Sequence, residues 1–212
     1  MIAAAAVSAE LLLVTEARGF VHDSIPAAVR SVERLGYRTR VLTDADELTA
    51  ARLAGAKAVV FLNTSGELGA VPRRRLLAWV RDGGAFVGAH AAADTWPSSR
   101  AFDAMLGADF VGHGPPAVRR VRIVDPAFTT QRSFAIREEF YAFRGRTARH
   151  VIARRPDGGA LVWTRRYGRG RVFYDALGHF GATWRDARQR RLMADGLRWA
   201  TRRDRAGGAR AA

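Results

Sequence analysis

The stretch at 83–94 constrains the fold of this chain more than any other. Its apolar run, Ala85 to Ala89, is short enough for a buried strand and ends at a histidine, His90. Three alanines and Asp94 follow, and this composition favours a helix. A polar side chain at the sharp turn between a strand and a helix is typical of a nucleophile elbow. We therefore predict that His90 stands at the tip of such a turn. A histidine that only caps the end of a buried strand is the alternative.

Short apolar runs alternate with helical patterns through the first half of the chain. Strands are expected at 11–15, 37–42, 57–62 and 85–89, and helices at 27–35, 44–53, 71–81 and 98–106. This alternation, with short connections, predicts a parallel sheet with right-handed crossovers. An irregular segment is expected at 107–116. The second half is rich in extended segments before a closing helix at 187–200, and these segments are 118–124, 137–143, 150–153, 160–164 and 171–176.

The expected architecture is an α/β fold. Its core would be a three-layer, flavodoxin-like, mostly parallel sheet with helices on both faces and an antiparallel β extension in the C-terminal half. We expect a single domain at 11–200. Residues 1–10 are expected to form a disordered leader, and 201–212 a disordered tail rich in arginine, glycine and alanine.

The composition excludes several kinds of site. The chain of 212 residues contains no cysteine, so disulfides, thiolate metal sites and a cysteine nucleophile are all excluded. No apolar stretch reaches the roughly 20 residues needed to cross a bilayer, and the N-terminus lacks the basic start of a secretory signal. We therefore expect a cytoplasmic protein without a membrane partner.

The formal net charge is +15, and nearly all of it comes from arginine, because Lys57 is the only lysine. Such an excess can attract nucleic acid. The arginines, however, are spread along the chain in short runs without clustered aromatic residues, which indicates a solvated surface. We expect no nucleic-acid partner, and a homodimer is left open.

Polar residues recur where the predicted strands end. Five of them stand at such ends, in the loops that follow, or at the start of an extended segment: His22, His90, His113, His179 and Glu139. Because the C-terminal ends of parallel strands share one edge of a sheet, these side chains can converge on one cleft. His150, at the start of a strand, is expected to be structural.

Convergent histidines and a carboxylate allow three kinds of site. General acid–base catalysis is the first, because histidine titrates near neutral pH. A metal site is the second, since neutral imidazole is a common ligand of zinc and similar ions. No two of these histidines show a local ligand spacing such as His-x-x-x-His, so the metal signal is weak. A polar pocket without catalysis is the third. Trp96 and Trp184 lie near the same edge, where an indole either stacks on a sugar ring or belongs to the core.

A set of motifs, in order along the chain, resembles the ThuA-like (trehalose utilisation) family over about 11–200. The motifs are GFVHDSI at 19–25, GAHAAAD at 88–94, FVGH at 110–113, EEFY at 138–141, GRGRVFY at 168–174 and LGH at 177–179. The resemblance implies a class I glutamine amidotransferase-like fold, in which the elbow carries a catalytic cysteine, with a histidine and a glutamate after a late strand. Here His90 occupies the elbow and His179 falls near the late histidine, but no acidic residue follows at the required spacing. Without a thiol, glutamine hydrolysis lacks its nucleophile, and we predict no glutaminase activity.

The resemblance also implies a role in the metabolism of trehalose and related disaccharides through keto-sugar intermediates. We expect an enzyme that acts on a disaccharide or keto-sugar or, as the alternative, a non-catalytic sugar-binding or regulatory protein. The expected catalytic residues are His90, oriented by Asp94, together with His113 and Glu139. The residues expected to bind the sugar are His22, Asp23, Trp96, Tyr141, His179 and Trp184. A divalent metal such as zinc is a further option as cofactor, and its candidate ligands are His22, His90, His113, Glu139 and His179.

Overall fold

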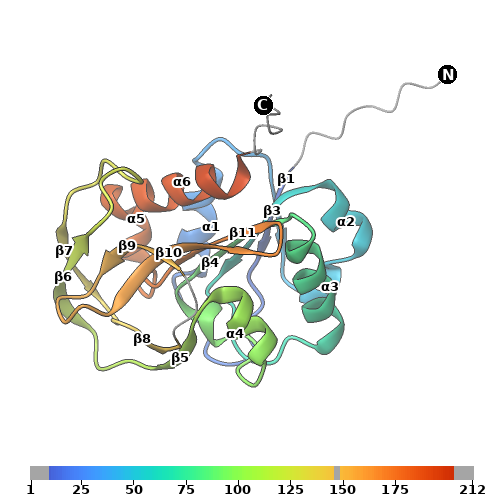
Figure 1. The fold of residues 1–212 in the computed structure, drawn as a ribbon, viewed down its shortest axis with the longest axis horizontal. Helices are drawn as coiled ribbons and strands as arrows, with labels where there is room; N and C mark the ends of the chain where they lie inside the picture. Colours follow the sequence, from blue (N-terminus) through green and yellow to red (C-terminus); the bar gives the residue numbers. More distant parts are fainter. Residues whose placement is uncertain (1–9, 146–148, 203–212) are drawn as a thin grey trace, which may run out of the picture.

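The apolar runs of the first half of the chain form the centre of a large sheet in the computed structural model, which describes residues 10–145 and 149–202 (Figure 1). Nine strands of the described chain pair in the order β2 (Thr39–Leu42), β1 (Glu10–Val14), β3 (Ala56–Leu62), β4 (Ala85–Ala89), β11 (Gly170–Asp175), β10 (Ala160–Tyr167), β9 (His150–Arg154), β6 (Ala117–Ile123) and β7 (Phe134–Glu138). The pairings from β2 to β11 are parallel, and those from β11 to β7 are antiparallel. Two further strands, β5 (Asp109–Gly112) and β8 (Ala142–Arg144), pair with each other.

Helices cover both faces of the parallel half (Figure 1). One face carries α1 (Ile25–Glu33), α5 (Gly181–Arg185) and α6 (Ala187–Thr201), and the other carries α2 (Ala50–Gly55), α3 (Ala70–Arg81) and α4 (Arg100–Leu106). Two 3-10 helices, η1 (Ala45–Glu47) and η2 (His90–Asp94), complete the connections. The parallel strands follow the flavodoxin-like order, with β11 in the fifth place. The predicted three-layer α/β fold with an antiparallel C-terminal extension is confirmed.

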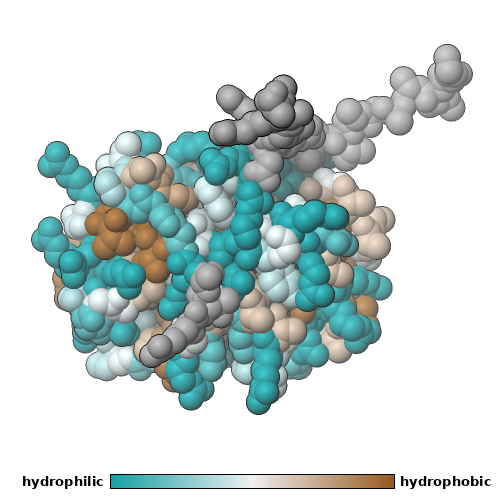
Figure 2. Space-filling view, in the orientation of Figure 1, coloured by the Kyte–Doolittle hydropathy of each residue, from teal (hydrophilic) through white to brown (hydrophobic). Residues whose placement is uncertain are grey.

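Burial on both faces explains why the central strands have continuous apolar sequences. Leu11, Leu12, Leu13 and Val14 of β1 are fully buried, as is every residue of β3 from Ala58 onward. Within residues 10–145 and 149–202, none of the helices has the length and apolar character needed to cross a bilayer. Hydrophilic side chains cover most of the face seen in Figure 2, and apolar side chains gather in a patch toward its β-rich end.

Some local expectations need correction. The segment at 107–116, expected to be irregular, contains β5. The extended segment expected at 137–143 is interrupted, because β7 ends at Glu138 and β8 begins at Ala142. Glu10 belongs to β1 rather than to a leader, and Thr201 is the last residue of α6 rather than part of a tail. The remainder of the expected leader and tail, 1–9 and 203–212, lies outside the described residues.

The contact between α6 and β11 gives a stability prediction. Gly196 of α6 lies next to the ring of Phe173, and an added Cβ would stand 2.3 Å from the nearest ring atom. We expect Gly196→Ala to lower the free energy of unfolding by about 1–3 kcal/mol, because the ring has no room to move in a packed core. Gly55→Ala is the matched control, since nothing lies within 4 Å of a Cβ there. Urea denaturation measures both variants, and an equally small effect on each would contradict the prediction.

Candidate functional site

His90 stands at the sharp turn that ends β4. Its backbone φ is +47°, in the left-handed region that residues other than glycine rarely adopt. Such strain is held in place by its surroundings and is common at functional sites. The turn is crowded: a Cβ at Gly88 would lie 3.1 Å from Phe86 and Tyr174. The turn therefore has the geometry predicted for an elbow, although the helix that follows is the 3-10 helix η2 rather than an α-helix.

The imidazole of His90 is fully buried, and its two nitrogens have different partners. Nδ1 lies 3.0 Å from the carbonyl oxygen of Ala176, so this nitrogen carries a proton and donates it. In the neutral ring Nε2 is then the acceptor, and the hydroxyl of Tyr141 lies 3.0 Å from it. This arrangement corrects the expected role of Asp94, because Ala176 takes the orienting contact that Asp94 was expected to make.

Three histidine rings from different strand ends meet at this turn. His22 follows β1, His90 follows β4 and His179 follows β11. The ring centroids are 4.8 Å apart for His22 and His90, 5.1 Å for His22 and His179, and 5.4 Å for His90 and His179. The sheet therefore brings together side chains that are far apart in the sequence, at the edge where open α/β sheets bind ligands.

Glu139 joins these rings to the fourth histidine. Its Oε2 atom lies 3.1 Å from Nδ1 of His179, 3.4 Å from Nε2 of His113 and 3.6 Å from Nε2 of His90. His113 comes from the loop after β5 and is more exposed than the others. The structure thus places all four predicted histidines and the predicted carboxylate in one cluster, whereas His150 lies elsewhere and pairs with Asp125.

Burial and the neighbouring charges set the ionisation of the cluster. Burial, followed by the adjacent His90 and His179, lowers the pKa of His22 to about 3. Burial is also the main reason that the pKa of His179 is lowered. Burial opposes ionisation of Glu139, but the surrounding histidines outweigh it and lower the pKa of this carboxyl. At neutral pH the cluster therefore holds the Glu139 carboxylate beside the neutral imidazoles of His22 and His179.

Tyr141 completes the cluster as a proton donor. The side chain is buried, and its ring lies 4.2 Å from that of His90, measured between centroids. Burial, and then the charge of Glu139, raise the pKa of the Tyr141 phenol far above neutrality. The phenol therefore stays protonated and can donate a hydrogen bond to His90 or to a ligand that takes its place.

Glu138 is a further buried residue of the site, and it was not predicted from the sequence. Its carboxylate accepts hydrogen bonds from the backbone N–H groups of Gly178 and His179, each at 3.2 Å, and from the hydroxyl of Thr183. These bonds fix the loop that carries His179. The signal in the sequence was the pair of consecutive carboxylates, of which Glu138 ends β7 and Glu139 follows it.

Two further residues near the site were not predicted. Asn63, after β3, has a φ of +54° and donates hydrogen bonds to the hydroxyl of Ser24 and the carbonyl oxygen of Gly178, which ties the loops after β1, β3 and β11 together. Phe20 is 64% exposed although its ring lies 4.8 Å from that of His22. An exposed aromatic ring beside polar groups is a surface on which a sugar can stack.

The two tryptophans expected to line a sugar site belong to the core instead. Trp96 is fully buried, and its indole N–H donates to the carbonyl oxygen of Gly69. Trp184 is 1% exposed and donates to the carbonyl oxygen of Gly178. The sequence could not separate the two roles, because both indoles follow strand ends. Asp23 is exposed beside His22, and its assignment to the sugar site stays a prediction.

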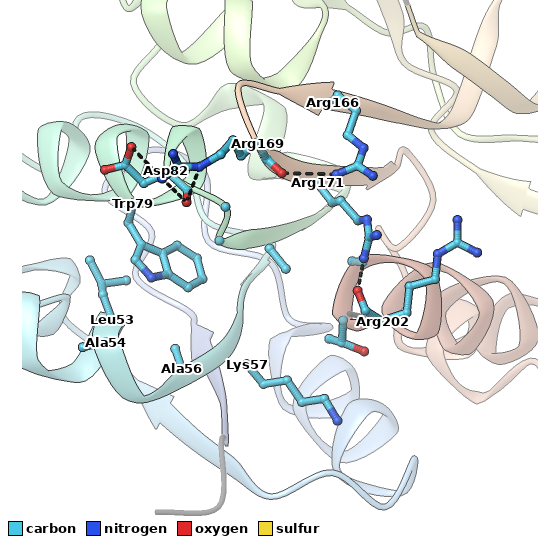
Figure 3. A pocket seen from close by; sticks show the side chains of 15 residues that line it. Leu53, Ala54, Ala56, Lys57, Trp79, Asp82, Arg166, Arg169, Arg171 and Arg202 are labelled. Atoms are coloured by element: carbon cyan, nitrogen blue, oxygen red, sulfur yellow. Dashed lines mark hydrogen bonds and ion pairs between the residues drawn. The ribbon is translucent and has the colours of Figure 1, made fainter. Parts of the chain in front are cut away.

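A cavity of about 1040 Å³ lies at the opposite end of the sheet, near the starts of β3 and β4 (Figure 3). Its charged lining is mostly basic, with Lys57, Arg166, Arg169, Arg171, Arg202 and one carboxylate, Asp82. Figure 3 shows Arg169 directed at Asp82 and Arg171 at the backbone of Arg202. The described lining contains no histidine, so the histidine cluster at the other end is the better candidate for catalysis.

Solved structures share this fold. A structure described as a ThuA-like protein from Bacteroides uniformis superposes with a TM-score of 0.75 and 18% identity, over 94% of each chain. A second, from Parabacteroides merdae, gives 0.74 and 18% identity over 91% of this chain and 90% of that one. A cytoplasmic protein from Salmonella typhimurium LT2 gives 0.69 and 14% identity over 90% and 99%. A search of curated protein sequences finds no match.

The family comparison agrees with the motifs of the sequence. The model of the ThuA family, described as trehalose utilisation, matches residues 10–200. That match includes every member of the histidine cluster and the strands that position it. This chain therefore belongs to the ThuA (trehalose utilisation) family, whose association with trehalose gives it a carbohydrate-related role.

Proposed function

We propose that this protein is an enzyme that acts on a disaccharide or keto-sugar by acid–base chemistry at the histidine cluster. The observation that carries the proposal is the contact of one carboxylate, Glu139, with three histidine side chains at the end of the parallel sheet. The family's association with trehalose supports the class of substrate.

The geometry suits proton transfer next to a sugar carbonyl. The carbonyl of a keto-sugar acidifies the neighbouring C–H bond, so a base that removes this proton and an acid that protonates the departing oxygen are needed. Nε2 of His90 has a lone pair for the first step, and Glu139 lies close enough to stabilise the resulting imidazolium. Tyr141 and the more exposed His113 can donate protons. Phe20 and His22 would contact the sugar at the mouth of the site.

The test is turnover of trehalose, 3-keto-trehalose and related glycosides by the purified protein, followed by chromatography of the products. The proposal expects one of these compounds to be consumed, with the keto-disaccharide as the leading candidate. Saturable binding of a sugar without turnover would instead support a non-catalytic sugar-binding or regulatory protein.

Glutamine provides a negative control for the same preparation. The purified protein is expected to release no ammonia from glutamine, because the elbow presents the imidazole of His90 where a thiol would be needed for the acyl-enzyme step. A coupled ammonia assay checks this expectation, and release above the spontaneous rate would contradict it.

A further inference from the structure

Two imidazoles of the cluster have a buried nitrogen that lacks a hydrogen-bond partner. These atoms are Nδ1 of His22 and Nδ1 of His179. The two rings lie nearly perpendicular, with an interplanar angle of 85°. His90 differs, because Ala176 and Tyr141 occupy both of its nitrogens. Leaving a buried polar atom without a hydrogen bond costs about 1–3 kcal/mol. Nδ1 of His179 has the Glu139 carboxylate nearby but forms no hydrogen bond with it, and Nδ1 of His22 has no hydrogen bond either. Both nitrogens are therefore available to a ligand that binds between them.

Glu139 supplies the third donor at this place. Its Oε2 atom is 3.1 Å from Nδ1 of His179. Four donor atoms lie within 4.8 Å of one another, and they come one each from His22, His90, His179 and Glu139. Adjacent ligands of an octahedral ion with bonds of about 2.1 Å lie about 3.0 Å apart. Oε2 of Glu139 and Nδ1 of His179 already have about this separation. The widest separation between donor atoms in the set is 4.8 Å, so these two atoms have to approach by less than about 2 Å.

We propose that His22, His179 and Glu139 bind one divalent first-row transition-metal ion through two imidazole nitrogens and a carboxylate oxygen. Such a set of two histidines and one carboxylate leaves coordination positions open for another ligand. We assign His90 to proton transfer rather than to the coordination shell, because each of its nitrogens already has a protein partner, the carbonyl oxygen of Ala176 at Nδ1 and the hydroxyl of Tyr141 at Nε2.

The rest of the site supports these ligands. Glu138 fixes the backbone of His179 through hydrogen bonds to two N–H groups, which is the kind of outer contact that orients a metal ligand. The catalytic use of the ion rests on the proposed function: an open position would take the carbonyl or hydroxyl oxygen of the sugar and polarise it. His90 and Tyr141 would remain for proton transfer.

Metal titration of the full-length protein tests the assignment. After treatment with a chelator, Zn²⁺, Mn²⁺ and Co²⁺ are titrated separately by calorimetry, and the bound metal is counted by mass spectrometry. We expect one ion of the preferred metal per chain. His22→Gln and His179→Gln should weaken binding at least about 10- to 100-fold, since loss of even an outer partner has effects of that size. His90→Gln and His150→Gln should bind like the wild type.

Several results would overturn the proposal. These are less than one bound ion per chain for every metal, unchanged affinity in His22→Gln and His179→Gln, or an equal loss in His90→Gln. Circular dichroism of the metal-free protein shows whether each histidine variant folds. If one does not, Glu139→Gln removes the third proposed ligand instead. Metal binding without sugar turnover would contradict only the proposed function. Sugar turnover by a chain that binds no ion would contradict only the metal site.

Discussion

Replacing His90 by glutamine is expected to lower turnover of the keto-disaccharide by about 10²- to 10⁴-fold, the range for loss of a positioned acid–base group. Glutamine keeps a polar side chain of similar length that can still donate to the carbonyl oxygen of Ala176. It has no nitrogen lone pair that can take a proton near neutral pH. The loss should therefore appear mainly in kcat, with a smaller change in KM. Steady-state kinetics with the substrate found for the wild type measures both constants.

His150→Gln is the matched control for this variant. His150 lies on the surface, where its side chain is 63% exposed and pairs with Asp125. The same substitution there should leave kcat and KM unchanged. Thermal unfolding of both variants shows whether either change disturbs the fold. Equal turnover by the wild type and by a folded His90→Gln would remove His90 from the mechanism.

Replacing Asp175 by asparagine is expected to stabilise the protein above neutral pH. Asp175 ends β11 and is fully buried, and burial raises the pKa of its carboxyl from 3.8 to about 7. A carboxyl whose folded pKa exceeds its unfolded value contributes stability below the unfolded pKa, and this contribution is lost as the pH rises through the folded pKa. Asparagine does not ionise, so the gain should grow between about pH 4 and pH 7 and then level off near 4 kcal/mol.

The hydrogen bonds of Asp175 can survive this substitution. The carboxylate accepts from the N–H of Leu177 and from the side-chain amide of Gln189. The oxygen of that amide, Oε1 of Gln189, is buried without a partner. A rotation of the Gln189 amide would therefore present this oxygen to the new NH₂ group of asparagine.

Urea denaturation at pH 5 and pH 8 measures the effect of Asp175→Asn. Asp157 provides a control of opposite sign, because the N–H of Gly159 lowers the pKa of its exposed carboxylate. Asp157→Asn should give no gain at pH 8. The same destabilisation by Asp175→Asn at both pH values would contradict the assigned protonation.

The parallel half of the fold could be predicted from the sequence because its strands are buried on both faces. The apolar runs that begin at Leu11 and Ala58 have no alternation, and short helical patterns separate them. Once these strands are parallel, the residues that follow them must share one edge of the sheet. The convergence of His22, His90 and His179 follows from that topology.

The remaining part of the site depends on contacts between distant segments. The residues at 137–143 have the composition of one extended segment, but β7 ends at Glu138. The carboxylate of this residue bonds to the backbone of Gly178 and His179, a contact that the local sequence does not reveal. The spacing of His90 and Asp94 suggested a contact between them, but the carbonyl of Ala176 takes that place. Burial of Trp96 likewise depends on Phe61 and Phe102, which pack against it from other elements.

Four of the five histidines are expected to share one ligand site. Histidine-selective NMR of the labelled protein tests this expectation most directly, because His150 serves as an internal control in the same sample. Addition of the keto-disaccharide to saturation should shift the ring signals of His22, His90, His113 and His179 and leave that of His150 in place. Binding or turnover of the sugar without a shift in any of these four signals would contradict the account.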